Sequence, residues 1–257
     1  MKPFDTHTHI MSERFDEDRE ALLAELFGNE LISGLIEIGT EPGDLEAVKH
    51  LAEQYEKVWF APGVHPHSAS EFTDETEAHI RSLLKHEKAV ALGEIGLDFH
   101  YDFSPRDIQR EVFIRQLRIA KSLNKPVIIH SREAAAEMFE TLKNENVTNG
   151  VLHCFSENAA HAEDILSLGL YIAFGGAITH KTRDELREAV KVVPLEKLLI
   201  ETDCPYMTPV PFRSKRNRPD FTMLTAEKIA ELKNISVEEV IKTTTQNAEK
   251  LFGIKIN

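Results

Sequence analysis

Two histidines separated by one residue, His7 and His9, lie near the start of the chain. If this segment is extended, both side chains point to the same face, because side chains alternate along a strand. Two imidazole nitrogens on one face can hold a divalent cation between them. By itself such a pair is a weak signal, since histidines in this pattern also occur solvated or packed in a core.

Four further side chains able to bind a metal stand at the ends of short apolar runs: Glu94, His130, His153 and Asp203. Each has an ordinary structural interpretation, such as a hydrogen bond at the end of a strand. The carboxyl ends of the strands in a parallel α/β barrel meet at one rim, where these residues would join the first two histidines. Four imidazoles and two carboxylates suffice for two divalent ions with positions left for water. Because residues able to bind a metal recur at the same end of five runs, the sequence favours a metal site.

The elements that must position these residues are apolar runs alternating with amphipathic segments. The predicted strands are Pro3–Asp5, Gly34–Gly39, Val58–Val64, Ala89–Ile95, Val127–His130, Val151–His153, Tyr171–Phe174 and Leu198–Glu201. Thr40 with Pro42 predicts the start of a helix reaching about Gln54, and Ser236 predicts another helix start. Runs that are apolar almost throughout indicate a parallel sheet covered by helices. We therefore expect one domain over residues 1–257, a single (β/α)₈ TIM barrel with its site at the carboxyl rim.

Composition narrows the class of protein. The net charge of −13 argues against nonspecific wrapping of nucleic acid, although it leaves room for an enzyme that reaches phosphates through bound cations. No glycine-rich dinucleotide or phosphate loop follows any run. Two cysteines are too few for a disulfide framework, and no run is long enough to cross a bilayer. We expect a cytoplasmic protein with no membrane partner and no obligate protein partner.

The motifs along the chain resemble, in order, those of the TatD-type metal-dependent deoxyribonucleases, a branch of the amidohydrolase superfamily. They cover nearly the whole chain: His7-Thr8-His9, Gly63-Val64-His65-Pro66-His67, Gly93-Glu94-Ile95-Gly96-Leu97-Asp98, His130-Ser131-Arg132-Glu133-Ala134, His153-Cys154-Phe155-Ser156, Glu201-Thr202-Asp203 and Asn217-Arg218-Pro219. One small departure is Cys204, where serine or alanine is common in the family.

The resemblance implies two divalent ions per chain. His7, His9 and Asp203 would hold one ion, His130 and His153 the other, and Glu94 would bridge the pair. Asp203 would also orient the attacking water and accept its proton, and Glu94 and His65 complete the expected catalytic set. The residues leave the metal open among Zn²⁺, Mn²⁺, Mg²⁺, Co²⁺ and Ni²⁺, although imidazoles favour ions softer than Mg²⁺.

Substrate contacts are expected from His65, His67, Arg132, Arg213, Arg216 and Asn217. Arg132 suits bidentate phosphate binding, with a salt bridge to Glu133 or to a neighbouring carboxylate as the ordinary alternative. Arg213 and Arg216 belong to a cationic cluster on the loop after the eighth run, in which Asn217 could fix the backbone. Four aromatic residues are placed for base stacking, with core packing as the alternative: Phe72, Phe99, Tyr101 and Phe103.

The expected activity is exonuclease-type hydrolysis of DNA, from single-stranded ends, by a water activated between two metals. The first alternative is another hydrolase on the same site, such as a deacylase acting on mischarged aminoacyl-tRNA or an amidohydrolase. The second is a metal-binding scaffold without turnover, which would predict an incomplete ligand set. All six predicted ligands are present in the sequence.

Overall fold

A computed structural model describes residues 1–256 as eight parallel strands alternating with helices. The strands are β1 (Phe4–Thr8), β2 (Gly34–Ile38), β3 (Val58–Ala61), β4 (Leu92–Asp98), β5 (Val127–Arg132), β6 (Gly150–Leu152), β7 (Tyr171–Phe174) and β8 (Leu198–Ile200). The α-helices are α1 (Arg19–Gly28), α2 (Leu45–Gln54), α3 (Asp74–Leu83), α4 (Arg106–Ser122), α5 (Ala135–Asn144), α6 (Ala159–Ser167), α7 (Asp184–Val192), α8 (Thr222–Lys233) and α9 (Val237–Phe252).

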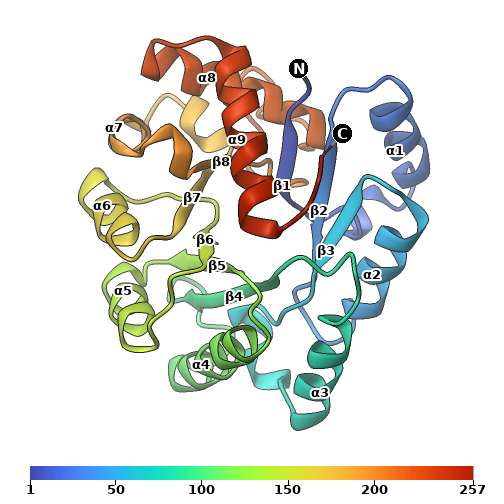
Figure 1. Cartoon of the computed structure of the whole chain (residues 1–257), viewed down its shortest axis with the longest axis vertical. Helices are drawn as coiled ribbons and strands as arrows, with labels where there is room; N and C mark the ends of the chain where they lie inside the picture. Colours follow the sequence, from blue (N-terminus) through green and yellow to red (C-terminus); the bar gives the residue numbers. More distant parts are fainter. Residues whose placement is uncertain (257) are drawn as a thin grey trace.

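The strands follow one another in chain order around a common axis, with the helices outside them (Figure 1). They form two parallel sheets, β1-β2-β3 and β4-β5-β6-β7-β8. Isolated parallel bridges join the sheets, one between Phe60 and Ala89 and one between Thr8 and Cys204. The ring of hydrogen bonds is thus interrupted at two seams. The (β/α)₈ barrel predicted from the alternation of runs is confirmed.

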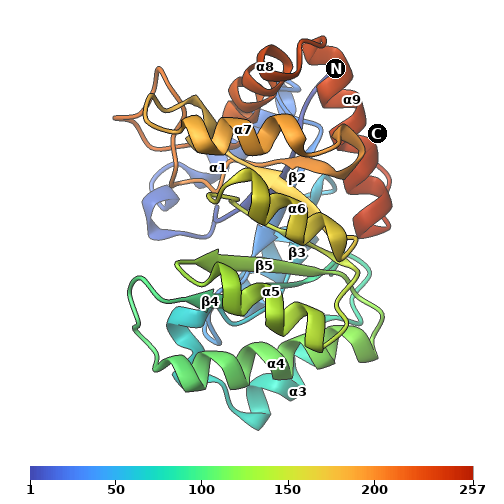
Figure 2. The same cartoon turned by 90° about the vertical axis from the view of Figure 1, so that its left-hand side faces the viewer.

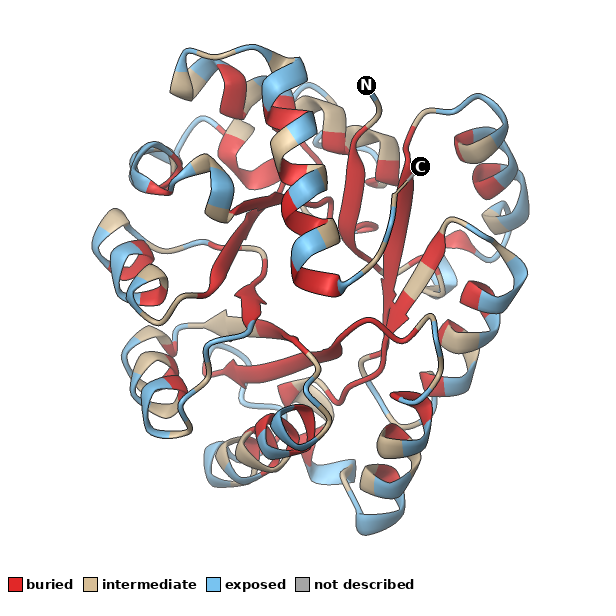
Figure 3. Ribbon diagram, in the orientation of Figure 1, coloured by how far each residue is buried: buried red, intermediate tan, exposed pale blue. Residues whose placement is uncertain are grey.

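Buried side chains separate into an inner and an outer cluster. Ile36 and Ile38 of β2 pack in the inner cluster, whereas Leu35 packs in the outer one, as the alternation of side chains along a strand requires. Both faces of a strand are therefore apolar, and the buried strands contrast with the exposed outer faces of the helices (Figure 3). This explains why the runs are apolar almost throughout.

Helix α9 closes the end of the barrel at which the strands begin. Ala248, Leu251 and Phe252 belong to the inner cluster, and the Asn247 amide donates to the carbonyl of Leu198, the first residue of β8. The loops after β4 and β8 extend from the opposite side (Figure 2). The carboxyl ends of the strands are therefore the end of the barrel left open for chemistry.

Several predicted boundaries are wrong, and one helix start is confirmed. Strand β1 ends at Thr8 instead of Asp5, β3 at Ala61 instead of Val64, and β5 at Arg132 instead of His130, while β4 begins at Leu92 instead of Ala89. Helix α2 begins at Leu45 because the Asp44 carboxylate accepts bonds from the backbone N–H and hydroxyl of Thr40, which forms a turn there instead. Strand β4 continues to Asp98, three residues beyond the predicted end. Ser236 caps α9 by accepting a bond from the Glu239 N–H.

Within residues 1–256, no helix combines the length and the apolar character needed to span a bilayer.

Candidate metal centre

The Glu94 carboxylate lies among five imidazole rings at the carboxyl end of the barrel. Its two oxygens face different rings. The distances from Oε2 are 3.3 Å to Nε2 of His7 and 3.7 Å to Nε2 of His9. The distances from Oε1 are 2.6 Å to Nε2 of His153, 2.8 Å to Nδ1 of His130 and 3.5 Å to Nε2 of His65. One buried carboxylate thus connects two groups of histidines.

Asp203 lies on the same side as His7 and His9. Its Oδ1 is 3.3 Å from Nε2 of His9 and 3.8 Å from Nε2 of His7, and the two histidine nitrogens are 3.2 Å apart. The Asp203 N–H donates to the carbonyl of His7, which ties the end of β1 to the segment after β8. The prediction that alternate residues place both imidazoles on one face is therefore confirmed by the geometry.

Two buried carboxylates hold the end of β1 in position. Asp5 accepts bonds from the Thr202 N–H and hydroxyl, at 2.9 and 2.6 Å, across the seam between β1 and β8. Glu37 of β2 accepts from the Thr8 hydroxyl and from the backbone N–H groups of Ile10 and Met11. The backbone on both sides of His9 is fixed by these bonds.

The charges in the centre perturb one another strongly. Burial opposes ionisation of Glu94, but the surrounding imidazoles, His153 first among them, hold the pKa of its carboxyl well below the usual range. Burial likewise opposes the charged form of His9, yet the bond to Asp203 raises the pKa of His9 to about 9. The pKa of His153 is also raised against burial by Glu94 and Glu201. In the chain without an ion, protons therefore occupy nitrogens that a cation would take.

Polar groups at the far side of several rings indicate which nitrogen is free to bind a metal. The His67 N–H donates to Nδ1 of His65, and burial lowers the pKa of that imidazole well below its usual value. Neutral His65 therefore carries its proton on Nε2, which faces Glu94 as a donor. His153 places Nδ1 3.4 Å from Oε1 of Glu201, which leaves Nε2 to face the centre.

Asp98 is a residue of the centre that the predicted site does not include. Its Oδ2 lies 2.9 Å from Nε2 of His67 and 3.1 Å from Nε2 of His130. Burial opposes ionisation, but the bonds from these histidines lower the pKa of Asp98. The ionised carboxylate only accepts bonds, so Nε2 of His130 carries a proton and Nδ1 faces the centre. The alternation of Glu94, Gly96 and Asp98 along β4 is the sequence signal that would have identified it.

The predicted substrate-binding residues have different surroundings. The Arg132 guanidinium carbon lies 4.7 Å from the centroid of the Tyr101 ring, and Glu133 bonds to His100. The alternative of a salt bridge between Arg132 and Glu133 is therefore not formed. The Arg216 guanidinium bonds to both oxygens of Asp18 and to the carbonyl of Arg14.

Asn217 is fully buried and holds the loop after β8 through the carbonyls of Thr202 and Tyr206, as expected of a residue that fixes the backbone. Arg213 is exposed on the same loop. The aromatic residues predicted to stack on bases differ in exposure. Phe99 is buried, whereas Tyr101 and Phe103 are 47% and 68% exposed.

The donor set fits divalent metal ions. Three groups of possible ligands have their ligand atoms within 4.8 Å of one another: His7 with His9 and Glu94, His65 with Glu94 and His130, and His7 with His153 and Asp203. The ion-pair partners of Glu94 in residues 1–256 are all imidazoles, with no lysine or arginine among them. Imidazole nitrogens with carboxylate oxygens form the ligand set typical of Zn²⁺ and similar ions.

Comparisons with known proteins relate nearly the whole chain to one family of metal-dependent hydrolases. The family described as TatD related DNase matches residues 4–253. The chain is 42% identical over 253 residues to the uncharacterized metal-dependent hydrolase YabD of Bacillus subtilis, covering 98% of this chain and 99% of that protein. It is 37% identical over 260 residues to the 3'-5' ssDNA/RNA exonuclease TatD of Escherichia coli K12, covering 98% and 99%. The crystal structure of YJJV, a TatD homologue from Escherichia coli K12, superposes with a TM-score of 0.92 at 31% identity, covering 98% of each chain.

Proposed function

The chain belongs to the TatD-related DNase family and is a metal-dependent hydrolase acting on ester bonds, and we propose that it is an exonuclease that hydrolyses phosphodiester bonds at single-stranded DNA ends. A relative with 37% identity is named as an exonuclease on single-stranded DNA and RNA. We propose that this chain likewise acts on single-stranded nucleic acid.

The observation that carries the proposal is the division of the histidines between the two oxygens of Glu94. His7 and His9 face Oε2, with Asp203 on the same side, and His130 and His153 face Oε1. We assign these residues, together with Glu94, as those that would hold two divalent ions. Bound there, the ions would polarise the phosphate and lower the pKa of a bound water.

The tautomers of the histidines around Oε1 of Glu94 distinguish the proposed metal ligands from a hydrogen-bond donor. His130 and His153 turn Nδ1 and Nε2, respectively, toward Glu94, because Asp98 and Glu201 face their other nitrogens. His65 turns a protonated Nε2 toward the same oxygen and is the farthest of the three from it. His65 therefore donates a hydrogen bond to a phosphate oxygen of the substrate, as its predicted role requires.

Asp203 completes the proposed reaction by accepting a proton. The pKa of its carboxyl is lowered against burial by the bond from His9, so the group is ionised at neutral pH. It accepts one proton of the water whose oxygen attacks phosphorus, and the bond from phosphorus to the leaving oxygen breaks.

Unpaired bases have a surface to stack on beside the centre. The rings of Tyr101 and Phe103 are parallel within 9°, with centroids 5.1 Å apart, and both are exposed. The His67 ring contacts both edge-on, and His67 shares Asp98 with His130. Exposed aromatic faces next to a phosphate-cleaving site favour single strands, since bases within a duplex are already stacked.

The first test is an activity assay with defined metals. Metal-free protein is reloaded separately with Mg²⁺, Mn²⁺, Co²⁺, Ni²⁺ or Zn²⁺ and given end-labelled single-stranded DNA. We expect stepwise loss of nucleotides with at least one ion, from an end that the position of the label identifies. Asp203→Asn is expected to lower the rate by about two orders of magnitude or more, because the proton acceptor is neutralised.

Metal content is measured in the same samples. Absence of cleavage at two bound ions per chain would contradict the nuclease proposal and direct the search to other esters, beginning with aminoacyl-tRNA. Comparable activity in Asp203→Asn at equal metal content would exclude Asp203 as the proton acceptor.

A further inference from the structure

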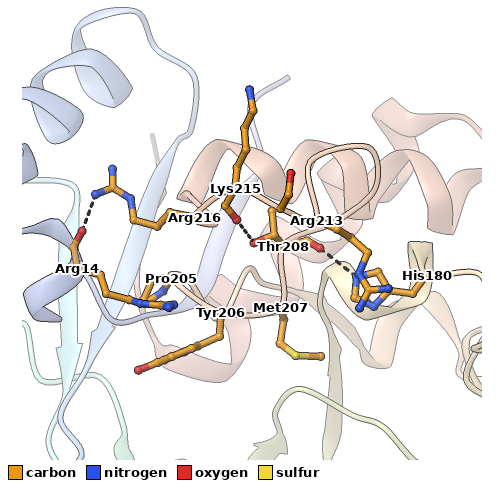
Figure 4. Close-up of a pocket in the computed structure, with 10 residues that line it drawn as sticks. Arg14, His180, Pro205, Tyr206, Met207, Thr208, Arg213, Lys215 and Arg216 are labelled. Atoms are coloured by element: carbon orange, nitrogen blue, oxygen red, sulfur yellow. Dashed lines mark hydrogen bonds between the residues drawn. The ribbon is translucent and has the colours of Figure 1, made fainter.

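A cavity of about 730 Å³ lies at the rim of the barrel, between the loop after β8 and the segment after β1. Its volume falls within the roughly 300–1,000 Å³ of sites that hold small ligands. Tyr206 and Arg14 lie at one end and Arg213 beside His180 at the other (Figure 4).

Tyr206 connects this pocket to the metal centre. Its ring is 49% exposed and lies edge-on to the His9 ring, with centroids 6.2 Å apart. The Arg14 guanidinium lies 5.6 Å from the centroid of the same ring. The backbone at Tyr206 is held in place, because the buried Asn217 amide donates to its carbonyl. A group leaving the metal centre on this side meets an aromatic face and a cation together.

The arginines of the pocket differ in whether their charge is already neutralised. Arg216 forms an ion pair with Asp18 and covers the Phe15 ring. Arg14 and Arg213 form no ion pair with a carboxylate within residues 1–256. Lys215, which also lines the pocket, likewise forms no ion pair with a carboxylate within the described residues. Cations left without counter-charges, in a protein of net charge −13, mark the pocket as a site for anionic groups.

We propose that the pocket binds the part of the DNA strand next to the scissile phosphate, with one base stacked on Tyr206 and successive phosphates facing Arg14 and Arg213. This inference rests on the proposed function and specifies its substrate, because it requires a polynucleotide extending beyond the reacting bond. A small phosphodiester would occupy the metal centre without reaching the pocket.

Lys215 supplies a matched control. It carries the same charge on the same loop, but its ammonium group points away from the other labelled side chains and lies 5.4 Å from the centroid of the Phe212 ring (Figure 4). Lys215 lines the pocket, but the ammonium group that Lys215→Ala removes lies toward the Phe212 ring, and the net charge changes by one unit, as it does when Arg14 or Arg213 is removed.

The first experiment measures binding of a fluorescent single-stranded oligonucleotide by anisotropy over a series of salt concentrations. The protein is metal-loaded and carries Asp203→Asn, so that the strand stays intact. The slope of log Kd against log salt is expected to fall by about 0.7 in Arg14→Ala and in Arg213→Ala, because each variant leaves one phosphate of the strand without its cation. Lys215→Ala is expected to keep the slope of the parent protein.

The second experiment compares two substrates with otherwise unaltered protein. The kcat/KM for the oligonucleotide is divided by that for the p-nitrophenyl ester of thymidine 5′-phosphate, which has no flanking nucleotide. Arg14→Ala, Arg213→Ala and Tyr206→Ala are each expected to lower this ratio on the order of tenfold, mostly through KM.

Unchanged salt slopes in Arg14→Ala and Arg213→Ala, or an equal fall in Lys215→Ala, would overturn the assignment of the pocket. So would a substrate ratio equal to that of the wild-type protein in all three variants. Failure of the wild-type protein to cleave either substrate would instead reject the proposed function, and the salt slopes would still decide whether the pocket binds a strand.

Discussion

The buried carboxylate of Asp98 contacts both the turn after β4 and two histidines of the centre. Its Oδ1 accepts bonds from the N–H groups of His100 and Tyr101, and its Oδ2 faces His67 and His130. The same side chain thus shapes the turn after β4 and orients a proposed ligand, as outer partners of metal-binding histidines commonly do.

Asp98→Asn tests this positioning role. The amide is a weaker acceptor than the carboxylate for the bond from Nε2 of His130, so we expect divalent-ion affinity to fall roughly 10–100-fold. Affinity is measured by competition with a chelator of known strength. Asp44→Asn is the control, because Asp44 also organises a turn after a strand, through Thr40, but contacts no histidine of the centre. Equal affinities in the wild-type protein and Asp98→Asn would show that Asp98 acts on the loop alone.

At the scale of elements, the strand that carries Glu94, β4, lies against the backbone of β5 at Gly96. Gly96 has a φ of +154° and lies against His130, where an added Cβ would stand 2.0 Å from the carbonyl oxygen. The glycine between Glu94 and Asp98 is therefore required both by its backbone conformation and by the neighbouring strand.

Gly96→Ala is expected to destabilise the fold by about 3 kcal/mol or more, since strain and overpacking act together. The midpoint of urea unfolding measures the change. Gly28→Ala at the end of α1 is the matched control, because nothing lies within 4 Å of the added Cβ there, and its effect should stay within about 1 kcal/mol. Similar midpoints for the two variants would contradict the close packing of β4 on β5.

The loop between β4 and α4 supplies the proposed stacking surface. Removing both rings with Tyr101→Ala and Phe103→Ala should weaken single-stranded DNA binding by roughly tenfold or more, given the usual contribution of base stacking. Duplex binding should change less, which a parallel titration with a blunt duplex measures. Phe72→Ala is the control, since Phe72 is partly buried against the core. Equal losses for single strand and duplex would contradict stacking on unpaired bases.

At the scale of the whole molecule, the candidate metal centre spans the seam between β1 and β8, one of the two places where the ring of hydrogen bonds is interrupted. His7 comes from β1, Asp203 from the segment after β8, and Glu94 from β4 in the other sheet. Ions that bind only the folded arrangement would therefore stabilise the closure of the barrel, in addition to supplying chemistry.

Removal of metal should accordingly lower the thermal midpoint. At an ion concentration about 100 times the Kd, linkage predicts roughly 2.7 kcal/mol of stabilisation, which corresponds to a Tm shift of about 5–10 °C at this size. Calorimetry with and without chelator measures it. His153→Ala should reduce the shift, because one of the two proposed ions loses a ligand, and His50→Ala should retain it in full, because the His50 side chain is 70% exposed on α2. An undiminished shift in His153→Ala would place the stabilising ion elsewhere.

The amino-acid sequence was sufficient to predict the barrel, its open end and the six proposed ligands. Those features follow from local rules: apolar runs alternate with amphipathic helices, and the carboxyl ends of parallel strands meet at one rim. His7 lies near the carboxyl end of β1, Glu94 and His130 lie inside β4 and β5, and the other three follow the ends of their strands: His9, His153 and Asp203. Asp98 lies beyond Ile95, the predicted end of its run, and becomes part of the strand through pairing with β5.

The partners of these residues, in contrast, depend on the folded arrangement. Arg216 is paired with Asp18, 198 positions earlier, so its charge is largely neutralised, whereas Arg14, which no motif contains, is a cation of the pocket. The division of the histidines between the oxygens of Glu94 likewise depends on side chains from separate strands. Periodicity in a sequence reports which face of an element a residue occupies, but the closure of the barrel fixes what lies opposite that face.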